Sequence, residues 1–432
     1  MRGTAGKKLA VILCILLSFV FLAESPLLVR SSAGLDPESD AAETPKKLIR
    51  WVDFNVPCEA MKKAIALDIL THDKDIKLNW IELLACLAAK NGNNFSRYKD
   101  SQLDALAQKL TSGTTISELT RDLKHYGYYL ESFNAILSGF VGDYELEVPN
   151  KEGTGKHWET RYGIKVFSPI AKNYPYNHYD DFGNQRSYGF SRPHLGNDLM
   201  GQVGTPIVAV EGGTVEALGW NQYGGWRIGI RSFDTKRYYY YAHLRKDHPY
   251  RKDLAVGSVV KSGDVIGYLG RTGYSRKENV NNIKTSHLHF GMQLVFDESQ
   301  KECNNEIWID VYEIVRLLDN KRCEVKKDLE TKDYYRLYDI RDKSPDTGSA
   351  LPNIRKEGNS MEDKKQSGYP VYTEDELGGI QQVAAATECT GLEPTPPASV
   401  SEAESYSELY NKPQQTEKVN NEFRKVNPEK RI

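Results

Sequence analysis

Short apolar runs separated by glycines fill much of the chain between residues 158 and 320, and this pattern constrains the fold more than any other feature. The runs are rich in β-branched and aromatic residues and have the length of strands. They are Pro206–Val210, Gly213–Val215, Trp226–Ile230, Tyr238–His243, Asp264–Leu269 and His287–Phe296. Such runs, joined by tight glycine turns, predict a mainly antiparallel all-β domain over residues 158–320. We expect Trp308–Leu318 to close this domain as a short amphipathic helix.

The segment that precedes the β domain has helical spacing. Apolar residues recur there at intervals of three and four, as at Trp80, Leu84 and Leu87. Thr115 and Glu118 form a Thr-x-x-Glu capping box, which marks the start of a further helix. Nothing in this region resembles a catalytic cluster, so a spacer, a targeting module and a lid all remain open as its role.

These patterns predict an α+β multidomain protein of 432 residues. A small helical N-terminal domain precedes the all-β domain, and a disordered C-terminal tail follows it. In chain order, the predicted parts are a signal peptide or signal anchor (1–33), a linker (34–57), the helical domain (58–150), the β-rich domain (158–320) and the tail (342–432).

The two ends of the chain have distinct compositions. Basic residues at positions 2, 7 and 8 precede an uncharged run, Leu9–Ala23, which is short for a membrane span. Ser31–Ala33 supplies the small residues that a signal peptidase prefers, so we expect secretion, with an uncleaved single N-terminal anchor as the alternative. The tail is rich in charged residues, proline, serine and threonine, and this composition predicts disorder.

Composition excludes several classes of protein. Lys and Arg total 57 against 59 Asp and Glu, which gives a net charge of −2, so no basic excess favours nucleic acid. A hydrophobic content of 39% excludes a polytopic membrane protein. The six cysteines, at 14, 58, 86, 303, 323 and 389, include no Cys-x-x-Cys motif, so a thiolate zinc ribbon is excluded. Cys58/Cys86 and Cys303/Cys323 are candidate disulfides in an exported protein.

Histidines in the β domain are the main chemical signal. Strict alternation from His287 to Leu294 places His287 and His289 on one face of a strand whose other face is apolar. The same alternation predicts that Tyr239, Tyr241 and His243 share one face. His194 and Asp198 have a borderline metal-ligand spacing, and Gly196 between them allows the backbone to bend. Together these residues predict a metal site.

The ordered set of motifs resembles the lysostaphin-type zinc metalloendopeptidases. The resemblance covers roughly residues 180–296. It rests on His194–Asp198, Gly204–Ala209, Tyr241–Leu244, Val259–Gly270, Thr272–Gly273 and His287–Phe290. The segment Tyr274–Ser286 is longer and more polar than usual for the family, which alters the expected shape of the substrate groove.

The resemblance implies a role for each candidate residue. It implies that His194, Asp198 and His289 bind one Zn²⁺ ion per catalytic domain, and that His243 and His287 are metal-free catalytic histidines. Three ligands leave a fourth zinc position for water, whose pKa the metal lowers to about 7. No His-Glu-x-x-His motif supplies a glutamate base, so the two metal-free imidazoles are the candidates for proton transfer, in an order that the sequence does not decide.

The sequence therefore predicts an exported zinc metalloendopeptidase that hydrolyses peptide bonds in bacterial peptidoglycan, either secreted or associated with the cell envelope. A non-catalytic member that binds peptidoglycan or activates a hydrolase is the alternative, but such members usually lose ligands. A biotinyl or lipoyl carrier barrel would need a Met-Lys-Met-like hairpin, which is absent. Aromatic residues before His194 are candidate groove walls: Tyr174, Tyr176, Tyr179, Phe182, Tyr188 and Phe190.

Overall fold

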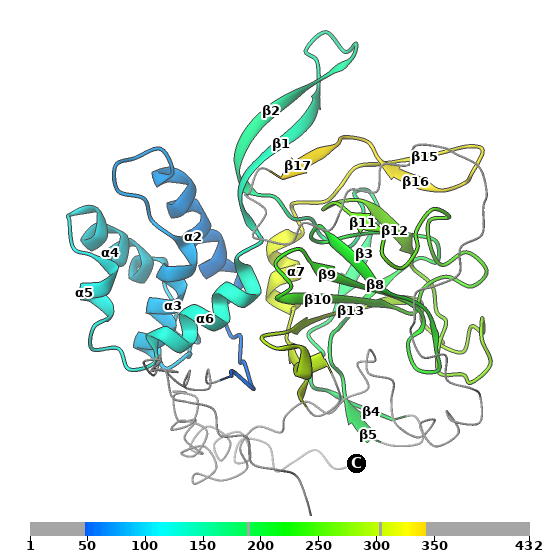
Figure 1. The fold of residues 1–432 in the computed structure, drawn as a ribbon, viewed down its shortest axis with the longest axis horizontal. Coiled ribbons are helices and arrows are strands. Elements are labelled where there is room, and N and C mark those ends of the chain that lie inside the picture. The colour runs from blue at the N-terminus through cyan, green and yellow to red at the C-terminus, as the bar shows by residue number, and fades with distance from the viewer. Residues whose placement is uncertain (1–47, 188–190, 302–304, 343–432) are drawn as a thin grey trace, which may run out of the picture. The chain divides into compact units, whose positions relative to one another are not determined.

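The structure is a computed structural model that describes residues 48–187, 191–301 and 305–342 (Figure 1). The predicted signal segment, most of the predicted linker and all but the first residue of the predicted tail lie outside the described residues. Within the described ranges, no helix combines the length and the apolar character that a membrane span requires.

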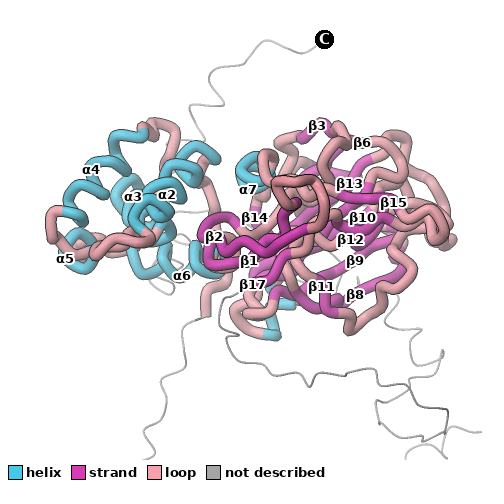
Figure 2. The backbone as a smooth tube through the Cα atoms, turned by 90° about the horizontal axis from the view of Figure 1, so that it is seen from above, coloured by secondary structure: helices cyan, strands magenta, loops and turns pink. Residues whose placement is uncertain are grey.

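The first part of the described chain is helical, as the sequence predicts. Its helices are α2 (Cys58–Thr71), α3 (Trp80–Asn91), α4 (Asp100–Thr111), α5 (Ile116–Thr120) and α6 (Tyr126–Leu137). Asn79 caps α3, because its side chain accepts hydrogen bonds from the backbone N–H groups of Ile81 and Glu82. The capping box of Thr115 and Glu118 is confirmed at the start of α5. In Figure 2 these helices form one group and the strands another.

A three-stranded antiparallel sheet follows, in the order β17-β1-β2. It consists of β1 (Val141–Pro149), β2 (Lys156–Ile164) and β17 (Ile340–Asp342), so it joins the start and the end of the β-rich region. The apolar pattern of the sequence does not predict these strands. Their side chains are largely exposed or half-buried, and the apolar signal of a buried strand is therefore weak.

The main sheet has eight strands and positions the candidate site. Its path is β11-β8-β9-β10-β13-β6-β3, with β14 paired to β13. The strands are β3 (Tyr176–His178), β6 (Asn197–Gly201), β8 (Gly213–Asn221), β9 (Gly225–Ser232), β10 (Arg237–Ala242), β11 (Val259–Val260), β13 (His287–Leu294) and β14 (Ile307–Ile309). All neighbours pair antiparallel, which confirms the predicted sheet type.

Short strand pairs complete the β region. They are β7 (Pro206–Val208) with β12 (Val265–Tyr268), β4 (Gln185–Ser187) with β5 (Ser191–Pro193), and β15 (Val325–Lys327) with β16 (Tyr334–Arg336). The closing helix α7 spans Tyr312–Leu318, so it begins later than predicted. Trp308 lies in β14 instead, where it is buried against Tyr240.

The strands of the main sheet are buried on both faces near its centre. Tyr239, Tyr241 and Phe290 lie in the larger apolar core, while Tyr240 and Trp308 pack in a second cluster on the other side. Every residue of β13 is buried. Polar side chains on this strand are therefore largely shielded from bulk solvent.

Cys58 and Cys86 are free, buried thiols in the structure. The disulfide considered between them is therefore not formed. Cys58 begins α2 and Cys86 lies within α3, so each sulfur packs as a small apolar group in the helical core. Cys14, Cys303 and Cys389 lie outside the described residues.

Candidate metal centre

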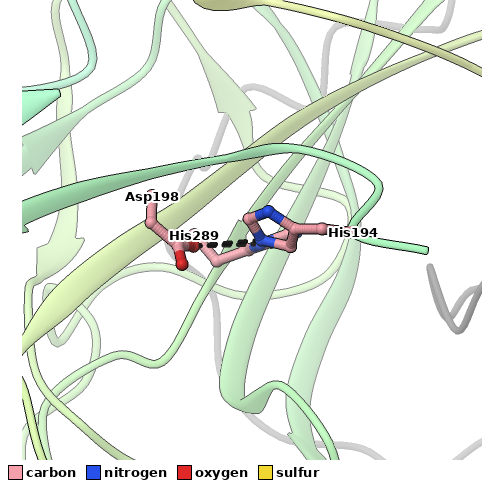
Figure 3. Close-up of side chains that lie close together, drawn as sticks. All are labelled: His194, Asp198 and His289. Carbon is pink, nitrogen blue, oxygen red and sulfur yellow. Dashed lines mark hydrogen bonds and ion pairs between the residues drawn. The ribbon is translucent and has the colours of Figure 1, made fainter. Parts of the chain in front are cut away.

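Three side chains from two neighbouring strands and the turn before one of them converge on one point (Figure 3). His194 lies between β5 and β6, Asp198 lies in β6 and His289 in β13. Asp198 and His289 are direct partners in the antiparallel pairing of β6 with β13. One ligand atom from each of the three residues lies within 4.8 Å of the others, and all three residues are buried.

The distances suit a shared metal ion. His194 Nε2 lies 2.8 Å from His289 Nδ1 and 3.1 Å from Asp198 Oδ1, and His289 Nδ1 lies 3.5 Å from the same oxygen. Asp198 Oδ1 is buried and has no hydrogen bond of good geometry. A buried carboxylate oxygen without such a partner is costly, and a cation would satisfy it. Two imidazoles and one carboxylate form a donor set that zinc accepts in open catalytic sites.

Gly196 allows the two strands to approach each other. A Cβ atom at this position would lie 2.6 Å from the backbone oxygen of Phe290 and 2.8 Å from His289 Cε1. Glycine is therefore needed at position 196 because a side chain there would collide with β13. The sequence had suggested a different reason, the flexibility of the glycine backbone. A larger residue would separate His194 from His289.

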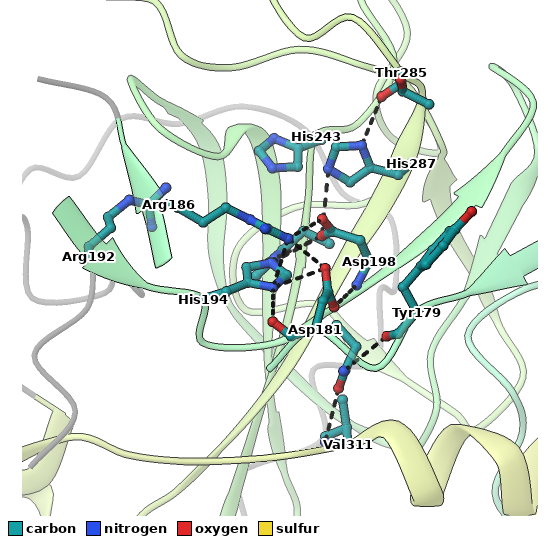
Figure 4. Close-up of polar contacts among 12 residues, drawn as sticks. Tyr179, Asp181, Arg186, Arg192, His194, Asp198, His243, Thr285, His287 and Val311 are labelled. Atoms are coloured by element: carbon teal, nitrogen blue, oxygen red, sulfur yellow. Dashed lines mark hydrogen bonds and ion pairs between the residues drawn. The ribbon is translucent and has the colours of Figure 1, made fainter. Parts of the chain in front are cut away.

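Asp181 and Arg186 support the cluster, and sequence reasoning missed both (Figure 4). His194 Nδ1 donates to the backbone oxygen of Asp181 at 3.1 Å and lies 3.3 Å from its Oδ2. Asp181 Oδ1 accepts from the backbone N–H of Asp198 at 3.1 Å. These contacts fix the ring of His194 with its Nε2 toward the other two side chains.

Arg186 reaches from β4 into the same cluster. Its Nη2 donates to Asp181 Oδ2 at 2.5 Å and to Asp198 Oδ2 at 3.1 Å. No spacing pattern identifies these two residues, because the chain reverses at Gly183 before it returns to His194. The adjacent acidic residues Asp180 and Asp181 are the one local sequence feature that could have suggested further polar residues at this site.

The charged groups shift each other's pKa values. Burial opposes the protonated form of His194, but its close contacts with the carboxylates of Asp181 and Asp198 outweigh burial and raise the pKa of His194 to about 9. Burial likewise opposes ionisation of Asp198, but the neighbouring histidines hold its pKa well below the usual value. Burial lowers the pKa of His289 to about 4, despite its contact with Asp198. The centre thus combines an ionised carboxylate with a neutral His289.

His243 and His287 lie beside the three clustered residues. Their ring centroids are 4.8 Å apart, and His287 Nε2 lies 3.6 Å from Asp198 Oδ1. Each ring bonds a backbone oxygen through Nδ1, His243 to Thr272 at 3.0 Å and His287 to Thr285 at 2.8 Å. A carbonyl oxygen only accepts, so Nδ1 carries the proton and Nε2 has the lone pair in the neutral ring. Burial, reinforced by His287 and His289, holds the pKa of His243 well below its ordinary value.

The predicted face of His243 is wrong. The side chains of Tyr239 and Tyr241 enter the larger core, whereas His243 faces the cavity together with Tyr240 and Ala242. His243 follows the end of β10 and has a φ of 61°, so the alternation of the strand does not continue to it. A left-handed backbone at a residue other than glycine is uncommon and is not evident from an apolar run.

The cluster opens into a cavity of about 290 Å³. Besides the five residues expected at the site, the cavity is lined by Arg186, Ser187, Arg192, Tyr223, Gly224, Tyr240, Ala242 and Tyr274. Of the aromatic residues proposed as groove walls, Tyr174, Tyr176, Tyr179 and Phe182 do not line this cavity. Tyr174 packs on Tyr334 instead, and the Tyr176 hydroxyl donates to Asp319. Tyr188 and Phe190 lie outside the described residues.

A known protein family matches the region that contains the cluster. Residues 192–303 match the profile of Peptidase family M23. The L-Ala–D-Glu endopeptidase of Bacillus subtilis is 38% identical over 124 residues, which are 29% of this chain and 36% of that protein. Lysostaphin of Staphylococcus staphylolyticus is 37% identical over 98 residues, which are 22% of this chain and 18% of that protein.

A crystal structure of a Ruminococcus gnavus protein aligns with a TM-score of 0.41 and 22% identity, over 65% of this chain and 92% of that chain. The matched region spans between 18% and 36% of the length of the two curated relatives.

Proposed function

Residues 192–303 are a peptidase family M23 domain, homologous to lysostaphin and to the L-Ala–D-Glu endopeptidase, and from this premise we propose that the chain is a zinc metalloendopeptidase acting on bacterial peptidoglycan. The observation that carries the proposal is the convergence of His194, Asp198 and His289 within 4.8 Å in a buried site. In this proposal those three residues hold one zinc ion. The Bacillus subtilis relative is an endopeptidase by name, which supports a peptide bond as the target.

Zinc in this site would supply Lewis acidity toward a peptide carbonyl and would lower the pKa of water. The protein supplies the orientation and the proton transfers. Asp181 holds His194 through its Nδ1, so the ring presents Nε2 to the centre. The ionised Asp198 balances cationic charge in a dry site.

His243 and His287 are proposed to move the protons of the reaction. Both rings line the cavity, and both have Nδ1 occupied by a backbone oxygen. Each neutral ring can therefore accept a proton only at Nε2, without a change of tautomer. Burial keeps His243 neutral, so the lone pair on its Nε2 is available to accept a hydrogen bond from water or from a polar group of the substrate.

We also propose that the protein acts outside the cytoplasm. Peptidoglycan lies there, and the predicted signal or anchor segment in residues 1–33 supports export.

The test is to incubate the full chain with purified peptidoglycan and to identify released termini by mass spectrometry. We expect new amino termini, loss of activity with a chelator and recovery with zinc, because the metal contributes directly to the reaction. His194→Ala should be inactive, while His157→Ala, at an exposed histidine outside the cavity, should match the wild type. Full activity in chelator, or an active His194→Ala variant, would overturn the proposal.

A further inference from the structure

Arg192 is a buried cation in the wall of the cavity. It lies in β5, lines the same cavity as His243 and His287, and is only 8% exposed. Its Nη2 donates one hydrogen bond, to the Tyr274 hydroxyl at 3.0 Å. Its Nε is buried and has no hydrogen-bond partner. Among the described residues, no carboxylate forms an ion pair with it.

The neighbouring arginine shows what Arg192 lacks. Arg186 and Arg192 are direct partners across β4 and β5, so two cations stand opposite each other, which is unfavourable in a sheet. Arg186 is neutralised by Asp181 and Asp198. Figure 4 shows Arg192 on the adjacent strand without a contact to either carboxylate.

The immediate surroundings of Arg192 are aromatic. Its guanidinium carbon lies 5.5 Å from the ring centre of Tyr223 and 5.8 Å from that of Tyr274. Contacts with ring faces hold the guanidinium in place, but they do not satisfy its five N–H donors. A guanidinium held by two rings and with most donors unused is arranged to bind a carboxylate through two parallel hydrogen bonds.

The position of Arg192 relates it to the reacting bond. The ring of Tyr274, which contacts Arg192, is stacked on His243 with centroids 5.8 Å apart. Arg192 is therefore two contacts from the proposed catalytic histidines. An extended peptide spans about 3.3–3.6 Å per residue, so a carboxylate on Arg192 would lie within about three residues of the bond at the metal centre.

We propose that Arg192 selects substrates that carry a free carboxylate within about three residues of the scissile bond. The inference rests on the proposed peptidase function and adds a substrate class to it: acidic peptides in preference to their amidated forms. The carboxylate would replace the counter-ion that Arg192 lacks. A neutral amide offers one acceptor oxygen and no charge, so it would leave the buried cation unbalanced.

The experiment compares one peptidoglycan preparation in two forms, native and with its free carboxyl groups converted to carboxamides. Initial rates of release of new termini are measured for both forms with the full-length wild type and with Arg192→Gln. We expect the wild type to act on the native form at least tenfold faster, and Arg192→Gln to reduce this ratio to nearly one. Arg192→Lys should restore part of the preference, since it keeps the charge but not the planar fork.

Arg97→Gln is the matched control, because Arg97 is exposed and the charge change is the same. This variant should keep the wild-type ratio. Equal wild-type rates on both forms, or an unchanged ratio in a folded Arg192→Gln variant, would overturn the role of Arg192 while leaving the peptidase function standing. Failure of the wild type to act on either form would instead overturn the proposed function, and the inference with it.

Discussion

His287 and His289 leave the same face of β13 but meet different partners. His289 Nδ1 lies in the three-residue cluster, whereas His287 Nδ1 is bound to a backbone oxygen beside it. We expect His289→Ala to lose zinc and activity together, as should His194→Ala and Asp198→Ala. His287→Ala and His243→Ala should keep near-stoichiometric zinc and lose a factor of roughly 100 or more in turnover. The zinc content and the turnover number of each variant are measured. Loss of zinc from His287→Ala with retention in His289→Ala would show that His287, and not His289, binds the metal.

Asp181 contributes through the orientation of His194 and not as a ligand. Asp181→Asn keeps the size of the side chain and removes its charge, so we expect zinc affinity to fall by about 10- to 100-fold. Competition with a chromophoric chelator gives the affinity. Asp180→Asn, at the exposed neighbouring carboxylate, should bind zinc as the wild type does. Equal affinities for the two variants would contradict the orienting role.

The sequence alone predicted the three residues that cluster, but not the residues that hold their side chains in place. Alternation along β13 placed His287 and His289 correctly, because a regular strand continues through both. It failed at His243, where the φ of 61° ends the alternation. The contacts of Asp181 and Arg186 depend on how β4 and β5 lead back to β6, and so does the lack of a carboxylate partner for Arg192 among the described residues. No local sequence pattern predicts that arrangement.

At the level of elements, the approach of the β5–β6 turn to β13 depends on Gly196. We expect Gly196→Ala to lose zinc and to destabilise the fold by about 1–3 kcal/mol, since its Cβ would clash with β13 backbone and the His289 ring. Gly127→Ala, whose Cβ would meet nothing within 4 Å, should not lower zinc binding or stability. Zinc content and urea unfolding measure the two effects. Full zinc occupancy in Gly196→Ala would contradict the close approach.

The connection between β14 and α7 contains a carboxyl group with an altered pKa. Burial raises the pKa of Asp310 to about 6, although its carboxylate accepts a hydrogen bond from the backbone N–H of Tyr312. The folded state therefore binds the proton more tightly than the unfolded state, whose pKa is about 3.9. Asp310 should thus reduce stability as pH rises from about 4 to about 6.

Asp310→Asn keeps an acceptor for the Tyr312 N–H and removes the charge. We expect the variant to be more stable than the wild type by up to about 3 kcal/mol at pH 7, and equally stable below pH 4. Urea unfolding of both proteins across this range, in the presence of a chelator, tests the sign. A difference that does not change with pH would contradict it.

The apolar runs predicted four strands of the main sheet, β8, β9, β10 and β13, because their apolar residues face the core. They did not predict its shorter strands β3, β6, β11 and β14. They gave no signal for β1 and β2, whose side chains are mostly exposed or half-buried. The short pair β15 and β16 also escaped prediction, and there the alternation is too brief to identify a strand.

Across the whole molecule, Arg237 connects the helical and β regions. Its side chain is 1% exposed, donates to the backbone oxygen of Ala135 at the end of α6, and pairs with Glu211 and Asp234. Removing one partner of a buried ionic network leaves uncompensated charge. We expect Arg237→Met to lower stability by about 3–5 kcal/mol and to weaken the coupling between the two regions.

Far-UV circular dichroism is dominated by the helices, whereas four of the six tryptophans lie at or beyond residue 158, so these two probes weight the two regions differently during urea unfolding. The wild type should show coincident transitions, and Arg237→Met should separate them. Arg161→Met, which removes an exposed arginine paired with Glu159, should change stability by less than about 1 kcal/mol. Coincident transitions at wild-type stability in Arg237→Met would contradict the connection.

The direct pairing of Asp198 with His289 has a consequence for how the sheet assembles. A slip of one residue between β6 and β13 would place Leu288 or Phe290 opposite Asp198 and turn the histidines to the other face. Such a chain could retain many backbone hydrogen bonds but would lack the proposed zinc site, so it would forgo about 4 kcal/mol of binding free energy at a metal concentration 1,000 times the dissociation constant. Metal binding would then stabilise only the correct strand register, and sheets with a shifted register would be both inactive and less stable.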